Sequence, residues 1–292
     1  MKIILSSNPY RDHGLRAALE AQRILKAAGA DTVVCIPFAP KKGDRVDMPK
    51  HVPVQLLADV LTDADLLICF GGDGTILHAA KAATLHNVPI MGVNMGSVGF
   101  MAELERGELK LLSSLTKNNG KLVTEDRMML DVKVYRGEKL LNSDLALNDV
   151  VISKGSMARV AEMEVLADGD QITELHGDGV IISTPTGSTA YSMSAGGPIV
   201  EPTSECTIVT PVCAHQLAAR AMVLNAKRVV TVRVPRGNRK HLYLSVDGSK
   251  AIRLSGGDRV EISRSARRTR LVRLLNRSFY QLINRKLGGC AQ

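Results

Sequence analysis

The segment that most constrains the fold is a predicted buried strand that runs directly into a glycine turn and a helix. Asp65–Phe70 has the apolar pattern of a parallel-sheet strand, and Gly71-Gly72-Asp73-Gly74 follows it. A helix is predicted from Thr75 to about Leu85, with Thr75 as its N-cap. This arrangement attracts anions, because free backbone N–H groups and the helix dipole both favour negative charge. The turn is therefore a candidate phosphate-binding site.

Asp73 indicates the function of this turn more specifically than the glycines do. A carboxylate about 4 Å from a phosphate charge costs roughly 4 kcal/mol at an effective dielectric constant near 20, so a site built only to hold phosphate would avoid it. The carboxylate is explained if it accepts the proton of an attacking hydroxyl group, or orients that group, while magnesium screens the phosphates. The alternative is a turn residue whose side chain only caps Thr75 or its neighbour. Because G-G-D-G-T lies between a strand and a helix, we favour the catalytic interpretation.

The first hundred residues repeat strand–helix units, which predicts a parallel sheet with right-handed crossovers. After about Val123 the apolar residues alternate with period two, and Asp-Gly pairs at 168–169 and 247–248 predict hairpin turns. Further predicted elements are strands at Lys2–Leu5, Thr32–Ile36, Pro89–Val93, Met129–Tyr135, Ala161–Leu166, Val229–Val234, His241–Val246 and Arg259–Ile262, and helices at Leu15–Ala28, near Val54–Leu61 and at Ser278–Lys286.

The predicted fold class is an α/β N-terminal domain plus an all-β, sandwich-like second domain. The first domain has a Rossmann-like parallel sheet but lacks the G-x-G-x-x-G fingerprint, and no P-loop or G-x-S-x-G motif occurs in the sequence. We expect residues 1–124, joined by the C-terminal segment 265–292, to form the α/β phosphate-binding domain. Residues 125–264 are expected to form a β-rich domain.

Charge and composition narrow the range of partners. The net charge is +9, and the segment from Ile262 to Gln292 carries eight basic residues and no acidic one. That segment is either a solvated basic face or a surface that steers anions. Aromatic residues make up only 3% and Trp is absent, which disfavours nucleic-acid binding.

The sequence also bears on location and on metal binding. No apolar stretch approaches the roughly 20 residues of a membrane helix, and the apolar opening stops at Ser6, so we expect a cytoplasmic protein without membrane contact. Five cysteines fit reduced thiols, and no metal-binding motif is present.

Together with G-G-D-G-T, four further segments resemble the NAD kinases. Gly92–Phe100 resembles the loop whose aromatic residue lies by the NAD adenine. Leu147–Val150 resembles the family's Asn-Glu or Asn-Asp motif, and Gly177–Pro198 resembles its longest signature. Cys213–Arg220 resembles the segment that follows, and the resemblance runs in order to about Gly257.

The resemblance implies transfer of the ATP γ-phosphate to the 2′-hydroxyl of the adenosine ribose of NAD, giving NADP, with Mg²⁺ or another divalent cation. Asp73 would accept the hydroxyl proton, and residues 125–264 would form the dinucleotide-binding domain. It implies a homodimer or homotetramer in which Asp178 and its neighbours reach a site shared between subunits. No protein ligand to a metal is predicted. The implied nucleotide-binding residues are Gly72, Asp73, Gly74, Thr75, His78, Phe100, Asn148, Asp149, Arg159, His176, Asp178, Thr189, Ala190, Tyr191, Ser192 and Ser194.

Other interpretations stay open at this point. Asn148-Asp149 is alternatively an Asx turn, and Gly177–Pro198 a small-residue turn that packs against the sheet. G-G-D-G-T also occurs in diacylglycerol-type kinases, and a similar motif occurs in phosphofructokinases. A catalytically silent NAD-sensing module is the rival from another class. The sequence departs from the family pattern at Ala214, Ala221 and Ser249.

Overall fold

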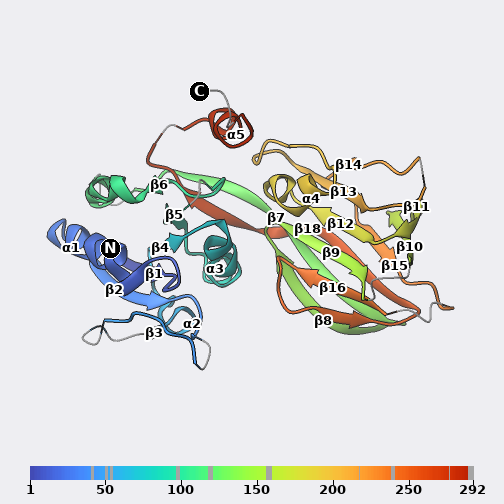
Figure 1. Cartoon of the computed structure of the whole chain (residues 1–292), viewed down its shortest axis with the longest axis horizontal. Helices are drawn as coiled ribbons and strands as arrows, with labels where there is room; N and C mark the ends of the chain where they lie inside the picture. Colours follow the sequence, from blue (N-terminus) through green and yellow to red (C-terminus); the bar gives the residue numbers. More distant parts are fainter. Residues whose placement is uncertain are drawn as a thin grey trace. The chain divides into compact units, whose positions relative to one another are not determined.

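The chain forms two compact units. The computed structural model describes residues 1–40, 43–49, 52, 55–96, 99–117, 121–155, 160–216, 218–237, 241–275 and 277–288. The first unit consists of Met1–Asp126 with Thr269–Gln292, and the second consists of Arg127–Arg268 (Figure 1). The long strands β7 (Thr124–Arg136) and β18 (Asp258–Val272) each contribute residues to both units. That one unit binds phosphate and the other the dinucleotide remains a prediction.

A parallel sheet organises the first unit, as the strand–helix repeats predict. Its strands lie in the order β3–β2–β1–β4–β5, and the C-terminal part of β18 pairs with β5. The strands read as nearly continuous apolar runs because both faces of the sheet are covered. The bounds are β1 (Lys2–Ser7), β2 (Asp31–Ile36), β3 (Gln55–Leu56), β4 (Leu66–Gly71) and β5 (Ile90–Asn94), with β6 (Leu104–Glu105) beside β5.

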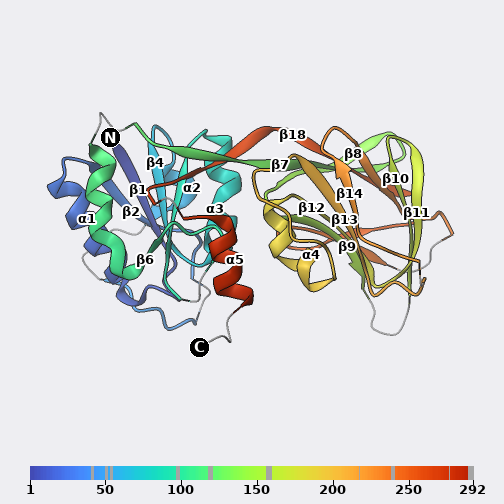
Figure 2. The ribbon, with the colours of Figure 1, turned by 90° about the horizontal axis from the view of Figure 1, so that it is seen from above.

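Helices cover the two faces of this sheet (Figure 2). Ile3 and Leu5 pack with Leu25 of α1 and Leu112 of η2 in one hydrophobic core, whereas α3 packs against β4 and β5 on the other face. The helix expected near Val54–Leu61 is wrong in extent: residues 55–56 pair in parallel with β2, so only one helical turn remains. The bounds are η1 (His13–Leu15), α1 (Arg16–Ala27), α2 (Leu57–Val60), α3 (Asp73–Leu85) and η2 (Arg106–Thr116).

The start of α3 differs from the prediction. Gly72, not Thr75, is the N-cap, and its carbonyl accepts a hydrogen bond of 2.9 Å from the Thr75 N–H. Thr75 lies in the first turn, is only 4% exposed, and its hydroxyl oxygen accepts from the Asn8 side-chain amide at 3.1 Å. Because Gly72 has extended backbone and is the N-cap, the helix begins three residues earlier than it would with Thr75 as the N-cap.

The second unit is the predicted all-β sandwich. One sheet has the order β11–β10–β15–β18, with β7 beside β18 and β8 beside β7, and the other has the order β14–β13–β12–β9–β16–β17. Alternate residues of both sheets, such as Val132, Ile152 and Val260, share one core. The remaining bounds are β8 (Lys139–Ala146), β9 (Asp149–Lys154), β10 (Ala161–Ala167), β11 (Asp170–Gly177), β12 (Gly179–Ser183), η4 (Thr186–Thr189), α4 (Tyr191–Ser194), β13 (Cys206–Val212), β14 (Met222–Asn225), β15 (Val230–Arg233), β16 (Leu242–Val246) and β17 (Ile252–Leu254).

Both predicted Asp-Gly turns are present. Asp168 and Gly169 have φ angles of 49° and 95° and join β10 to β11 as a two-residue hairpin. Asp247 and Gly248 have φ angles of 49° and 69° and open the longer connection from β16 to β17.

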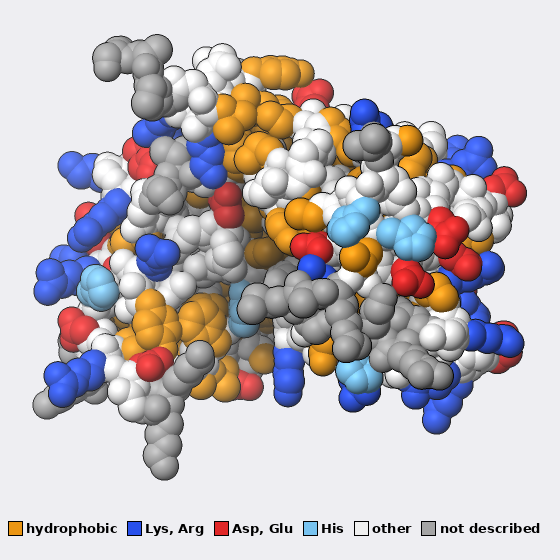
Figure 3. Space-filling model, turned by 45° about the vertical axis from the view of Figure 1, so that its right-hand side comes forward, with side chains coloured by type: hydrophobic (Ala, Val, Ile, Leu, Met, Phe, Trp, Pro, Cys, Tyr) orange, Lys and Arg blue, Asp and Glu red, His pale blue; other side chains and the backbone are white. Residues whose placement is uncertain are grey.

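The basic C-terminal segment is largely paired within the fold. Its helix α5 (Phe279–Leu287), predicted at 278–286, belongs to the first unit and starts at Ser278 with a capping box. Arg264 and Arg268 pair with Glu205, Arg277 pairs with Glu108, and Arg273 reaches Glu103 at 3.1 Å. Basic and acidic side chains are intermixed on the face in Figure 3. The segment is therefore not simply a solvated basic face.

The described part of the chain contains no helix with the length and apolar character needed to cross a bilayer. Four of the five cysteines lie in that part, and all four are free thiols, as expected.

A buried carboxylate anchors the C-terminal segment, and its removal should destabilise the first unit. Glu103 is 2% exposed and accepts from Arg273, from the Leu274 N–H at 2.8 Å and from the Leu275 N–H. We expect Glu103→Ala to lower the free energy of unfolding by about 3 kcal/mol, since it leaves buried donors unpaired. Urea unfolding checks this against Glu20→Ala on the exposed side of α1. Equal stability of the two variants would contradict the anchoring role.

Candidate functional site

The carboxylate of Asp73 is held by a neighbouring loop. Its Oδ2 accepts from the Phe100 N–H at 2.8 Å and its Oδ1 from the Met101 N–H at 3.1 Å. In the capping alternative, the Asp73 side chain would bind Thr75 or its neighbour. The two hydrogen bonds instead connect Asp73 to the 99–101 loop. Because each carboxylate oxygen can accept more than one hydrogen bond, the half-buried Asp73 keeps capacity for a ligand hydroxyl.

Two kinds of glycine surround this carboxylate. A Cβ atom at Gly71 would collide with Thr75, and one at Gly99 would collide with Asp73, so these two positions need glycine for packing. By contrast, a Cβ atom at Gly72 or Gly74 would meet no described atom within 4 Å. The fold does not need glycine at these two positions, which leaves the backbone at the start of α3 open to a ligand. The first N–H groups of a helix lack partners within the helix, so a phosphate can bind there.

His78 and Phe100 flank the turn. His78 is exposed on α3, and its ring meets Phe38 edge-on at 5.5 Å between centroids. Phe100 is only 9% exposed because the C-terminal helix covers it: the Phe279 ring lies 6.4 Å away and the Lys286 ammonium lies 4.2 Å from the Phe100 centroid.

In the second unit, Asp247 holds the Asn148-Asp149 motif. Its carboxylate accepts from the backbone N–H groups of Leu147, Asn148 and Asp149 at 2.7 to 3.0 Å. The motif is therefore fixed by a residue that the sequence indicated only as part of a turn. Burial raises the pKa of Asp247, although the three backbone hydrogen bonds act to lower it.

The two side chains of this motif have unusual environments. Asp149 is 6% exposed, and burial, followed by the nearby Asp247 charge, raises its pKa to about 7. The Asn148 Oδ1 atom is buried and has no hydrogen-bond partner in the described part of the chain. An unpaired buried acceptor costs free energy, so a ligand N–H or O–H donor would stabilise it.

The loop that follows β12 packs against this motif. Thr184 donates its backbone N–H to the Asn148 carbonyl at 2.9 Å, and a Cβ atom at Gly187 would collide with the same carbonyl. Tyr191 is 47% exposed and Ser194 is exposed, while Thr189 and Ala190 are half-buried. Ser192 is fully buried and its hydroxyl is 2.8 Å from that of Thr210, so it supports the loop from inside.

The remaining predicted residues lie near the β11–β12 connection. Asp178 pairs with Lys154 at 2.5 Å, and the His176 ring nitrogen lies 3.4 Å from Glu174, with all four side chains partly exposed. Arg159 falls outside the described residues. A cavity of about 390 Å³ lies beside this region, lined by residues that include Gly196, Thr210, Cys213 and Arg220. It contacts both of the segments, Gly177–Pro198 and Cys213–Arg220, that resemble family motifs.

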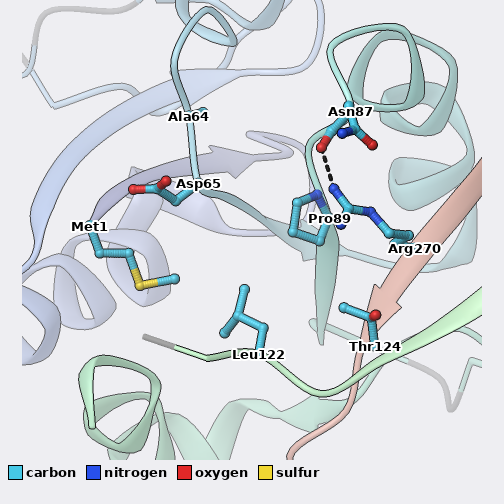
Figure 4. Close-up of a pocket in the computed structure, with 8 residues that line it drawn as sticks. All are labelled: Met1, Ala64, Asp65, Asn87, Pro89, Leu122, Thr124 and Arg270. Carbon is cyan, nitrogen blue, oxygen red and sulfur yellow. Dashed lines mark hydrogen bonds between the residues drawn. The ribbon is translucent and has the colours of Figure 1, made fainter. Parts of the chain in front are cut away.

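Another cavity lies away from the predicted residues (Figure 4). It measures about 520 Å³ and is lined by residues such as Asp65, Pro89 and Arg270, at the amino ends of β4 and β5. Gly71–Thr75 lies at the carboxyl end of β4. Figure 4 shows Arg270 turned toward the Asn87 carbonyl, to which it donates a hydrogen bond. This cavity therefore contains none of the predicted site residues.

The structure thus brings some of the predicted residues together in each unit, whereas His176 and Asp178 lie at the other end of β12 from Asn148 and Asp149. The structure brings Gly72, Asp73, Gly74, Thr75 and Phe100 together at the start of α3, and it brings Asn148, Asp149 and the 184–189 loop together in the second unit. Sequence reasoning missed the supporting roles of Gly99 and Asp247. The only local signal for Asp247 was its D-G turn, which does not reveal a contact with residues 98 to 100 positions away. No group of three or more His, Cys, Asp or Glu within the described ranges could hold a metal ion.

Comparison with known proteins identifies the family to which the two units correspond. The ATP-NAD kinase N-terminal domain matches residues 4–117, and the ATP-NAD kinase C-terminal domain matches residues 147–274. The chain is 34% identical to an NAD kinase of Ruminiclostridium cellulolyticum over 98% of this chain and 97% of that one. It is 42% identical to an NAD kinase of Natranaerobius thermophilus over 80% and 81% of the two chains.

Solved structures show the same fold. A yeast NADH kinase complexed with NADH superposes with a TM-score of 0.84 at 23% identity, over 100% of this chain and 89% of that one. An NAD kinase from Archaeoglobus fulgidus in complex with ATP gives a TM-score of 0.73 at 22% identity, over 100% of both chains.

The α/β unit with its carboxylate-bearing glycine turn and the β-sandwich unit define a phosphotransferase of the ATP–NAD kinase class. The chain belongs to the NAD kinase family.

A methyl group at Gly99 should displace the proposed base. We expect Gly99→Ala to slow phosphate transfer about 100-fold, because its Cβ would occupy the position of the Asp73 carboxylate. Steady-state turnover checks this, with Gly96→Ala as the matched control, since that Cβ would meet no described atom within 4 Å. Full turnover in Gly99→Ala would show that the carboxylate position does not matter.

The raised pKa of Asp149 makes stability depend on pH. Its pKa rises from 3.8 to about 7 on folding, so the folded protein binds this proton more tightly than the unfolded chain. Stability is therefore lost as the pH rises through this window, by about 4 kcal/mol.

Asp149→Asn removes that loss, so the variant should gain stability relative to the wild type between about pH 5 and about pH 8. Urea unfolding at both pH values measures the difference. The exposed Asp170→Asn serves as the control, and a pH-independent difference for Asp149→Asn would contradict the assignment.

Proposed function

We propose that the protein phosphorylates NAD at the 2′-hydroxyl of its adenosine ribose, with ATP as donor and NADP as product. The observation that carries this proposal is the Asp73 carboxylate, held by two N–H groups at a helix start whose glycine backbone is open. A carboxylate fixed beside an anion-binding backbone suits the deprotonation of a hydroxyl that attacks a phosphate. Membership of the NAD kinase family supports NAD as the acceptor.

Phosphate would bind at Gly72 and Gly74, where backbone N–H groups and the α3 dipole face the anion. Thr75 would support the same turn, since its own N–H donates to the Gly72 carbonyl. Asp73 orients the attacking hydroxyl and accepts its proton. Catalysis in this scheme is mostly positioning and charge stabilisation. ATP would arrive as its Mg²⁺ complex, in which the phosphates supply ligands and the cation screens their charge. Asp73 is the one carboxylate of the turn that could add a ligand, which fits the small number of protein carboxylates that Mg²⁺ commonly uses.

The second unit would recognise the dinucleotide through Asn148 and Asp149. The unpaired Asn148 Oδ1 suits an N–H or O–H donor of the ligand. With a pKa of about 7, Asp149 can both donate and accept a hydrogen bond near neutral pH. The exposed Tyr191 offers a ring on which a base can stack. His78, Phe100, His176, Asp178, Thr189, Ala190, Ser192 and Ser194 complete the proposed contact set, in which Ser192 acts from the interior.

We also propose a cytoplasmic location and a homodimer or homotetramer in which Asp178 reaches a site shared between subunits. Family resemblance supports both. The partial exposure of Asp178, at 37% of its side chain, supports a role outside the core of one chain.

Incubation of the purified protein with ATP, Mg²⁺ and NAD tests the proposal and should give NADP. A panel of NAD, NADH, diacylglycerol and fructose 6-phosphate separates a dinucleotide kinase from the lipid and sugar kinases that share the turn. Phosphorylation of a lipid or sugar in place of the dinucleotide would overturn the proposal. Binding of NAD without ATP consumption would indicate a sensing module instead.

Asp73→Asn should retain NAD binding and lose most turnover, by about 10²- to 10⁴-fold, because the amide cannot accept the proton. The amide also presents a donor to the Phe100 or Met101 N–H, so thermal unfolding must accompany the assay. Calorimetric NAD binding separates lost chemistry from a displaced loop. Full turnover in this variant would remove Asp73 from its role.

A further inference from the structure

Lysine and arginine are absent from the two segments that meet at the proposed polyphosphate-binding corner of the first unit. His78 is the basic side chain of these segments, and the nearby Arg273 and Arg277 are paired with Glu103 and Glu108. The stretch Gly71–Ala80 contains no Lys or Arg, and neither does Gly92–Leu104. These two segments meet through the hydrogen bonds of Asp73 with Phe100 and Met101. Nucleotide substrates bring several negative charges to a place that already holds the Asp73 carboxylate. A cation from elsewhere in the chain would offset that charge.

Lys286 reaches this corner from the C-terminal helix. Its ammonium lies 4.2 Å from the centroid of the Phe100 ring. The backbone N–H of that same Phe100 donates to Asp73 at 2.8 Å. Lys286 and Asp73 therefore contact the same residue, the lysine at the Phe100 ring and the aspartate at its backbone N–H.

The segment that carries Lys286 is fixed, while the side chain itself is exposed. Glu103 binds residues 273–275, Ser278 caps α5, and Phe279 lies against Phe100. Cation–π contacts at exposed sites are weak, and the lysine stem is flexible. A phosphate oxygen would form a stronger, charge-assisted contact with the same ammonium. The side chain can therefore exchange the ring for a phosphate without movement of its helix.

We propose that Lys286 is a substrate-positioning residue that binds a phosphate group of the nucleotide at the Asp73–Phe100 corner. This inference rests on the proposed function. The chemistry that Lys286 recognises is a nucleotide di- or triphosphate, which either the NAD pyrophosphate or ATP can supply. Separate titrations of NAD and ATP distinguish the two sources.

Three variants test the charge apart from the packing. Lys286→Met keeps a long apolar side chain on the Phe100 ring and removes the charge. Lys286→Arg keeps the charge. Arg285→Met removes an equal charge from the adjacent exposed position of α5 and is the matched control.

We expect Lys286→Met to raise KM for NAD or for ATP about tenfold, with kcat changed by less than about twofold. Lys286→Arg should restore most of the affinity, and Arg285→Met should match the wild type. The KM of the wild type should also rise with added salt more steeply than that of Lys286→Met, because the charge contact is screened. If Lys286 had only a structural role, KM would depend on salt equally in the wild type and in Lys286→Met.

Unchanged KM for both substrates in Lys286→Met, or equal losses in the Met and Arg variants, would overturn the assignment. Failure of the proposed function looks different, since the wild type itself would then make no NADP. In that case calorimetric binding of ATP to wild type and to Lys286→Met still tests the phosphate contact, and equal affinities would overturn it.

Discussion

Two backbone N–H groups, those of Phe100 and Met101, hold the Asp73 carboxylate, and the proposed active corner of the first unit depends on this contact. It ties the start of α3 to a loop that follows β5. Gly99 allows the close approach, since any Cβ there would displace the carboxylate. The position of the proposed base is thus set by a neighbouring loop more than by its own helix. Through Phe100, the same contact extends to the C-terminal helix.

The second unit uses a related device for a different purpose. Asp247 also accepts backbone N–H groups from a distant loop, but it holds the Asn148-Asp149 motif and is not itself a proposed ligand contact. Its charge helps to raise the pKa of Asp149. In both units an aspartate that precedes a glycine fixes a remote loop. Only for Asp73 do we propose a chemical task in addition to that structural one.

Local pattern was sufficient to predict the fold class and part of the element order, but it missed η2 and several strands of the second unit, such as β12 and β13. The buried strand before Gly71, the period-two strands after Val123 and the two Asp-Gly turns are all present. What failed or was missed depends on partners far away in sequence. The stretch 55–56 became a strand because β2 lies beside it, and Asp247 acts on residues about 100 positions away. The basic segment could not be assigned from its charge alone, because its acidic partners, such as Glu103 and Glu205, are distant. The nucleotide contacts of individual residues remain predictions.

The first unit is made of two chain segments, and the second unit lies between them in the sequence. This division affects the order in which the two units can fold during synthesis. Strand β5 cannot pair with β18, and Glu103 cannot bind the Leu274 and Leu275 N–H groups, until the whole sandwich has been synthesised. Domains generally fold in the order of their synthesis. Here the residues of the sandwich are contiguous in the chain, so the second unit can fold first. The first unit begins to be synthesised first but can complete its fold only last.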